Sequence, residues 1–183
     1  KGSLEDLEKA VKLNPNDFFV FRQRGITKRE LKDYKGSLED LDKADKLNPN
    51  DSWILKERGS TKRMLKDYKG SIEDLDKADN LKPNNYFTLS ERAESKRGLG
   101  DLKGSLEDLE KADKLKQNDS DILKERGAAK RLLKDYKDSL EDLKKADELK
   151  PNNSDILTQR GITKRKLEDY KGSLEDLDKA DKL

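Results

Sequence analysis

Residues Ser52 to Asn85 read SWILKERGSTKRMLKDYKGSIEDLDKADNLKPNN, and near copies of this stretch recur through the chain every 34 residues. One set of glycines shows the interval, because its members are separated by multiples of 34. They are Gly2, Gly36, Gly70, Gly104 and Gly172, with Asp138 in the one missing place. A fixed period of this length is typical of repeat architectures, in which each repeat contacts only its neighbours.

Two helical patterns lie within the stretch, on either side of a short polar break. Apolar and small residues recur at helical spacing in each. They are Leu55, Gly59 and Leu65 in the first pattern, with Lys62 at the same spacing, and Ile72, Leu75, Ala78 and Leu81 in the second. We expect Asp67 to cap the second helix, Pro83 with Asn84 and Asn85 to end it, and Asn85 or Ser52 to cap the next first helix. The unit is therefore helix, turn, helix.

These residues resemble the tetratricopeptide repeat, whose pattern contains Trp, Leu-Gly, Tyr, Ala and Pro at fixed offsets. The matches in this unit are Leu55, Gly59, Tyr68, Leu75, Ala78, Leu81 and Pro83. The resemblance covers the whole chain and implies an all-α fold, a right-handed α-solenoid, or superhelix, of antiparallel helix pairs. It divides residues 1–183 into a single array: a lone second helix in 1–17, then repeats 18–51, 52–85, 86–119, 120–153 and 154–183.

Charged residues replace apolar ones at several positions that normally point inward in this family. Arginine stands before the helix glycine, lysine stands four residues later, and aspartate occupies two positions of the second helix. In the repeat 52–85 these residues are Arg58, Lys62, Asp74 and Asp79. Because a buried charge without a partner is costly, we expect Arg58 and Lys62 to reach Asp74 and Asp79 across the helix pair. Five copies would form a ladder of ion pairs.

Bulk composition excludes several kinds of protein. Hydrophobic residues make up 31% and charged residues 45%, a balance that would suggest disorder without the periodicity. Net charge is +2, which by itself gives no reason to expect nucleic acid or a membrane as partner. There is no cysteine, no signal peptide is recognisable, and no apolar run is long enough to span a bilayer. We expect an intracellular, cytoplasmic protein, and the first residue, Lys1, suggests a segment of a longer array.

The third repeat departs most from the others. Ala93 replaces the helix glycine, Gly98 and Gly100 flank Leu99, and Gln117 replaces proline. Gly98 lies inside a helix and is expected to cost roughly 1 kcal/mol relative to alanine. Gly100 occupies a turn position that the family gives to glycine, and a left-handed backbone there would strain the non-glycine residues of the other repeats. Those residues are Lys32, Lys66, Lys134 and Glu168.

The resemblance also implies which residues face the concave groove of the array. The second residue of the repeat is aromatic in three repeats, the fifth is often basic, and the twelfth is always arginine. The candidate ligand-binding residues are Phe19, Arg22, Arg29, Trp53, Lys56, Arg63, Phe87, Arg97, Lys124, Arg131 and Arg165. Aromatic residues and arginine dominate the energetics of protein recognition. They favour a groove for an acidic peptide with bulky apolar side chains, although the rings could instead pack on the preceding helix and the arginines form a solvated row.

Other functions fit the residues less well. Some arrays of this family clamp a C-terminal carboxylate, but Ser60 and Ala128 stand where that clamp has asparagine. Nucleic acid could follow the arginine row, yet the second helices are acidic, so it is not expected. Without histidine or cysteine the usual catalytic constellations are absent, and we expect no enzyme, no catalytic residue, no cofactor and no metal site.

The sequence therefore predicts a scaffold that binds a protein or peptide partner. A structural spacer, or an assembly element that stacks end to end through uncapped termini, is the alternative.

Overall fold

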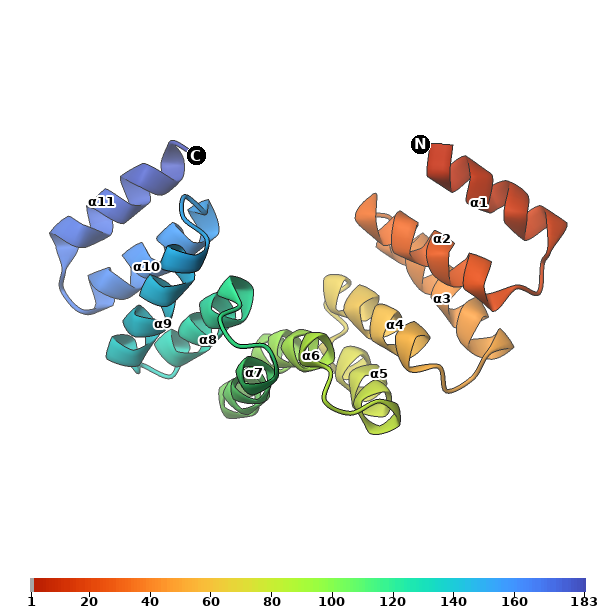
Figure 1. The fold of residues 1–183 in the computed structure, drawn as a ribbon, viewed down its shortest axis with the longest axis horizontal. Helices are drawn as coiled ribbons and strands as arrows, with labels where there is room; N and C mark the ends of the chain where they lie inside the picture. Colours follow the sequence, from red (N-terminus) through yellow and green to blue (C-terminus); the bar gives the residue numbers. More distant parts are fainter. Residues whose placement is uncertain (1) are drawn as a thin grey trace. The chain divides into compact units, whose positions relative to one another are not determined.

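The computed structural model describes residues 2–183, with side chains from residue 4 onward, as helices joined by short turns (Figure 1). The helices are α1 (Gly2–Leu13), α2 (Phe18–Glu30), α3 (Tyr34–Leu47), α4 (Ser52–Met64), α5 (Tyr68–Leu81), α6 (Tyr86–Gly98), α7 (Leu102–Leu115), α8 (Ser120–Leu132), α9 (Tyr136–Leu149), α10 (Ser154–Lys166) and α11 (Tyr170–Asp181). The described residues contain no strand. The predicted all-α class of tandem helix pairs is confirmed.

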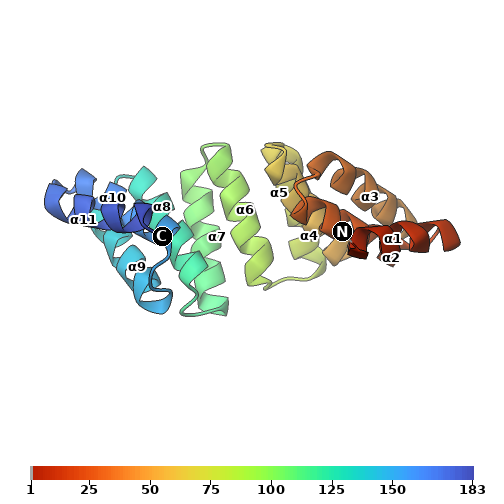
Figure 2. The same cartoon turned by 90° about the horizontal axis from the view of Figure 1, so that it is seen from above.

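The helices form two compact units, Lys1–Leu99 with α1 to α6 and Gly100–Leu183 with α7 to α11. In the first unit α2 packs on α3 and α4 packs on α5, and in the second α8 packs on α9 and α10 packs on α11 (Figure 2). Each of these pairs is one repeat, made of a first helix and a second helix. That all repeats form one continuous array remains a prediction.

First helices line the concave side of each unit. In the first unit α2 contacts α4 and α4 contacts α6, and in the second unit α8 contacts α10. Within each unit, no second helix contacts another second helix among the described residues. Because the first helices approach one another more closely than the second helices do, each stack of repeats curves towards its first helices.

A glycine allows the two helices of a repeat to approach closely. A Cβ atom at Gly59 would lie 2.8 Å from Cγ of Leu75 and 3.2 Å from the backbone oxygen of Ser71. Leu75 is fully buried at this contact. Gly25, Gly127 and Gly161 lie in the same way in their repeats, which explains why the position is so regular.

Side-chain caps fix where each helix begins. Asp67 accepts a hydrogen bond from the backbone N–H of Gly70, as predicted for the start of α5. Asn85 caps α6, also as predicted, by accepting from the N–H groups of Phe87 and Thr88. The expectation that Ser52 can cap a first helix is wrong, because Ser52 is already the first residue of α4 and Asp51 caps it.

Buried hydroxyl groups join neighbouring repeats. Ser71 in α5 and Ser95 in α6 lie 2.8 Å apart through their Oγ atoms, and Ser37 pairs with Thr61 in the same way. In the second unit the corresponding residues are Ser105 and Ala129. Alanine has no hydroxyl, and the buried Oγ of Ser105 is left without a partner.

The predicted charge ladder is present, with one change in its pairing. Arg58 donates from Nε and Nη2 to the two carboxylate oxygens of Asp74, each at 2.8 Å, and Lys62 Nζ lies 2.7 Å from the same carboxylate. The expectation that Asp79 also pairs with Arg58 is wrong, because Asp79 accepts a hydrogen bond from Arg92 of the next repeat at 3.2 Å. Arg58 itself reaches back to Asp45 of the preceding repeat at 2.7 Å. Arg58, Arg126 and Arg160 each join two repeats in this way.

Burial and pairing act in opposite directions on the aspartates of the ladder. Burial alone would raise the pKa of Asp74, but hydrogen bonds from Arg58 and Lys62 outweigh it, and the pKa is lowered from its ordinary value. The pKa values of Asp142 and Asp176 are lowered for the same reasons by Arg126 with Lys130 and by Arg160 with Lys164. All three aspartates are thus held in the charged form.

The turn between the two helices of each repeat is left-handed, which confirms the expected strain. Lys32, Lys66, Lys134 and Glu168 have φ between 62° and 68°, and Gly100 has φ of 84°. Gly98, just before this turn, has a packing reason to lack a side chain: a Cβ there would lie 2.6 Å from ring atoms of Tyr68. The expected gain from replacing Gly98 with alanine is therefore opposed by this contact.

Candidate functional site

Three aromatic side chains are exposed at the start of the first helices in the first unit. Phe19, Trp53 and Phe87 are the second residues of α2, α4 and α6, and their exposed fractions are 51%, 49% and 42%. The neighbouring ring of Phe18 behaves differently, since it packs against a core cluster of Phe21, Ala44 and Ile54. Phe18 therefore belongs to the core, whereas Phe19, Trp53 and Phe87 each leave about half of their surface exposed.

Basic side chains lie between the exposed rings. The guanidinium carbon of Arg22 is 4.9 Å from the ring centre of Phe19 and 5.3 Å from that of Trp53. Lys56 Nζ is 4.8 Å from the ring centres of both Trp53 and Phe87. Ring and cation alternate along Phe19, Arg22, Trp53, Lys56 and Phe87, which we call the aromatic–cation column. Cation–π contacts of this kind contribute about 0.5–2 kcal/mol each and order the exposed rings.

The arginine row of the first helices is engaged within the protein. Arg29 Nη2 donates to Glu57 at 2.6 Å, and Arg63 donates from Nε to Glu91 at 3.0 Å. In the second unit Arg131 Nη2 donates to Gln159 at 2.8 Å. In each case the acceptor lies 28 residues further along, on the next first helix. These arginines form a hydrogen-bonded brace between adjacent repeats. Neither expectation for the row, solvated or ligand-binding, included this role.

Sequence reasoning missed the acceptors of this brace. Glu57 and Glu91 occupy the sixth position of their repeats, and that position holds Glu or Gln in every repeat. A Glu or Gln 28 residues after Arg29, Arg63 and Arg131 was a usable signal, because both residues of each pair lie on first helices that contact each other. Arg97 also interacts within the protein, whereas Arg165 is exposed at the last first helix and has no partner among the described residues.

The second unit carries different residues at the positions of the column. Asp121 and Asp155 stand where the first unit has aromatic rings, and both are exposed. Lys124 keeps the basic position, but its Nζ lies 3.3 Å from Glu125 and 4.0 Å from Asp121. The candidate residues therefore fall into two groups. Five candidates of the first unit form the continuous aromatic–cation column, and no such column is present among the described candidates of the second unit.

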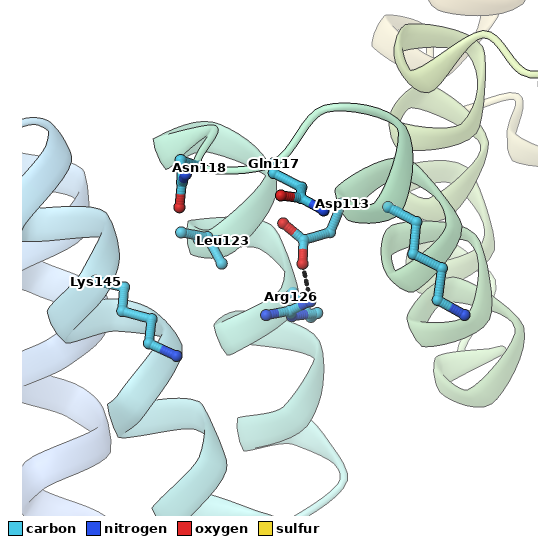
Figure 3. A pocket seen from close by; sticks show the side chains of 7 residues that line it. Asp113, Gln117, Asn118, Leu123, Arg126 and Lys145 are labelled. Atoms are coloured by element: carbon cyan, nitrogen blue, oxygen red, sulfur yellow. Dashed lines mark hydrogen bonds and ion pairs between the residues drawn. The ribbon is translucent and has the colours of Figure 1, made fainter.

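The second unit also contains a cavity of about 230 Å³ near the turn between α7 and α8 (Figure 3). It is lined by Asp113, Lys114, Gln117, Asn118, Leu123, Arg126 and Lys145. The ion pair on its wall, between Arg126 and Asp113 at 2.7 Å, belongs to the charge ladder. This pair is thus already used in joining repeats.

The described residues also show neither a metal site nor a membrane span. Among residues 2–183, no group of acidic side chains is arranged to hold a metal ion. No described helix combines the length and the hydropathy needed to cross a membrane.

Known proteins resemble this chain in fold. No protein-family model matches the sequence, and no curated protein matches it. Solved structures do match. YrrB, described as a TPR protein with an unusual peptide-binding site, is 21% identical over 97% of this chain and 91% of its own, with a TM-score of 0.71.

Two further solved structures agree. MamA from Desulfovibrio magneticus RS-1 is 20% identical over 91% of this chain and 94% of its own, with a TM-score of 0.78. TTC0263, a thermophilic TPR protein of Thermus thermophilus, is 19% identical over 90% of each chain, with a TM-score of 0.77. At such identities the likeness concerns the fold.

Proposed function

Because the chain has the tetratricopeptide-repeat fold, we propose that it is a non-catalytic protein–protein interaction scaffold. Its partner is a peptide or partner segment, acidic and with bulky apolar side chains, that lies on the first helices. The observation that carries this proposal is the aromatic–cation column of the first unit. Three large rings are exposed there and ordered by cations, and residues of these types supply most of the binding energy at protein interfaces.

The column is suited to binding because its rings are already held in place. A side chain that is ordered before binding loses less conformational entropy when a partner arrives. Each of Arg22 and Lys56 contacts two rings, so the column presents one surface across α2, α4 and α6. An apolar side chain of a ligand would cover a ring edge while an acidic one meets a cation.

The engaged arginine row argues against nucleic acid as the partner. A protein that follows a phosphate backbone needs cations free to neutralise it. Arg29, Arg63 and Arg131 each already donate to a side chain of the next repeat. These three arginines are therefore poorly placed to follow phosphates.

Selection from a random peptide library with the full chain tests the proposal. Enriched peptides should bind the wild type and lose at least about tenfold in affinity on Trp53→Ala, as expected for an aromatic anchor. Leu149→Ala removes an exposed apolar side chain of the second unit and is the matched control. Equal loss in both variants, or no loss on Trp53→Ala with helicity unchanged, would contradict the proposal.

Self-assembly is a second candidate, favoured by one observation. On α11 the side chains of Tyr170 and Leu174 are both 62% exposed, although the residues corresponding to Leu174 in α3, α5 and α9 are half-buried. Another repeat stacked on α11 would cover them. Sedimentation at several protein concentrations tests this candidate, and a monomer at every concentration would eliminate it.

A further inference from the structure

Arg22 differs from five other arginines of the first unit in its lack of an acidic partner. Arg24, Arg29, Arg58, Arg63 and Arg92 each donate to a carboxylate. For Arg22 no hydrogen bond or ion pair is present among the described residues, and its contacts are the rings of Phe19 and Trp53. Its guanidinium is therefore held in position by stacking alone.

One donor of Arg22, its Nε, is unsatisfied as a result. Its Nε is shielded from solvent and has no hydrogen-bond partner. A ring face attracts the charge but does not replace a strong acceptor, and a buried donor without an acceptor is unfavourable. A guanidinium carries neighbouring nitrogens side by side, the arrangement that a carboxylate accepts in two parallel hydrogen bonds.

Around Arg22 and Lys56 the cations outnumber the carboxylates that they contact, whereas further along α4 Arg63 lies between two carboxylates, Glu91 and Glu94. Lys56 and Arg29 both contact the same carboxylate, that of Glu57, at 2.9 Å and 2.6 Å. Two cations therefore share one carboxylate, and Arg22 is a third cation that has no carboxylate partner. A ligand with negative charge next to apolar groups complements this surface, and one carboxylate suffices to pair Arg22.

We infer that Arg22 recognises the side-chain carboxylate of an aspartate or glutamate within the partner peptide, whose neighbouring apolar side chains lie on Phe19 and Trp53. This inference rests on the proposed function and specifies it. An internal residue is favoured over a chain end because rings flank Arg22 on both sides. A peptide that covers both rings must continue in both directions from the carboxylate.

Synthetic peptides with blocked ends provide the test, because their only carboxylate is then a side chain. One series carries two leucines and a single glutamate moved along a glycine–serine peptide, and a second series has glutamine in its place. A third series is the glutamine series with a free C-terminal carboxylate. Affinities for the full chain are measured by fluorescence anisotropy, with wild type, Arg22→Gln, Arg22→Lys and the control Lys77→Gln. Lys77 is an exposed residue of α5, and its replacement removes the same charge away from the column.

The glutamate series should bind the wild type at least about tenfold more tightly than the glutamine series at the best position. Arg22→Gln should abolish that difference, Arg22→Lys should retain only part of it, and Lys77→Gln should leave it unchanged. Circular dichroism of each variant checks that the fold is intact.

Other outcomes overturn the inference in distinguishable ways. Equal binding of the glutamate and glutamine series, lost in Trp53→Ala, would refute the role of Arg22 and leave the proposed function standing. Tight binding of the free C-terminal series alone would show that the carboxylate is a chain end. Absence of binding by every series would count against both proposals.

Discussion

At the scale of single residues, the repeat tolerates residues that are locally unfavourable. Lys66 adopts a left-handed backbone with φ of 62°, where a side chain costs about 1–2 kcal/mol. Only Gly100 avoids that cost at the corresponding turn. Ser105 is another such residue, because its hydroxyl is buried without a partner. Each of these sites offers a substitution that should stabilise the protein.

Lys66→Gly should raise the free energy of unfolding by about 0.5–1 kcal/mol, since glycine relieves the left-handed strain at a smaller entropic cost. Lys77→Gly makes the same substitution at an exposed position inside α5 and should lower the free energy of unfolding by about 1 kcal/mol. Urea denaturation of both variants measures the difference. Changes of the same sign in the two variants would contradict the explanation.

Ala129→Thr should stabilise the second unit by about 1 kcal/mol, because its hydroxyl would reach Ser105 as Thr61 reaches Ser37. Thr61 and Thr163 occupy the same position in their repeats while fully buried, so the larger side chain has room. Thr61→Ala should cost about 1–2 kcal/mol by leaving Ser37 without a partner. Thermal unfolding of the two variants, each compared with the wild type, measures these changes. Destabilisation by Ala129→Thr would mean that the fourth repeat is packed differently.

At the scale of the helix, one cap is missing for an identifiable reason. Asp33, Asp67, Asp101 and Asp169 each accept from the N–H of a glycine three residues later. In the fourth repeat Asp138 replaces that glycine, and Asp135 makes no capping hydrogen bond. A Cβ atom at the glycine position would collide with the capping carboxylate, and the second negative charge repels it. The start of α9 is therefore weaker than its counterparts.

Asp138→Gly should restore the cap of α9 and raise the free energy of unfolding by about 0.5–1 kcal/mol. Asp138→Ala is the control, because it removes the charge but keeps the colliding Cβ atom. Hydrogen exchange at the amide of residue 138 reports the cap directly. Equal protection in the two variants would mean that charge repulsion alone had broken it.

The periodicity allowed the helices, most of their caps and the ladder of charges to be predicted, because each depends on residues at fixed spacing. Asp79 was assigned to the wrong arginine because spacing alone does not tell which of two neighbouring repeats a side chain faces. The brace between Arg29 and Glu57 was missed for the same reason. The positions of Arg22 and Lys56 between rings depend on side-chain conformation, which the sequence does not fix.

At the scale of the whole molecule, charged pairs occupy places that apolar contacts fill in other arrays. Arg58, Arg126 and Arg160 each bind an aspartate of their own repeat and one of the preceding repeat. The loss of one partner would leave the other charges half-buried and uncompensated. Stability should therefore depend on pH through these aspartates.

The free energy of unfolding should fall on acidification, and the sign follows from the lowered pKa values. The ordinary pKa of aspartate is 3.8, and the pKa values of Asp74, Asp142 and Asp176 lie below it in the folded protein. Their contribution is complete above that value and is lost as the pH falls through the lower, folded pKa values. Urea denaturation at a series of pH values between about 6 and about 2 measures the slope.

Asp74→Asn provides the comparison for this pH dependence. It should cost roughly 3–5 kcal/mol at neutral pH, because Arg58 and Lys62 lose their shared partner. It should also reduce the slope below about pH 4, since one fewer aspartate takes up a proton on unfolding. An unchanged slope would show that the ladder is not the source of the acid sensitivity.

The arginines that pair with the preceding repeat also affect how the chain could change in length. Arg58 uses Asp45 from the repeat before it, and Arg92 uses Asp79 in the same way. If residues 52–85 were deleted as a block, Arg92 would take the place of Arg58 and meet Asp45 instead. No charge would be stranded at the junction. A gene encoding this array could therefore lose or duplicate this repeat by unequal recombination and still encode a chain whose ion pairs are complete.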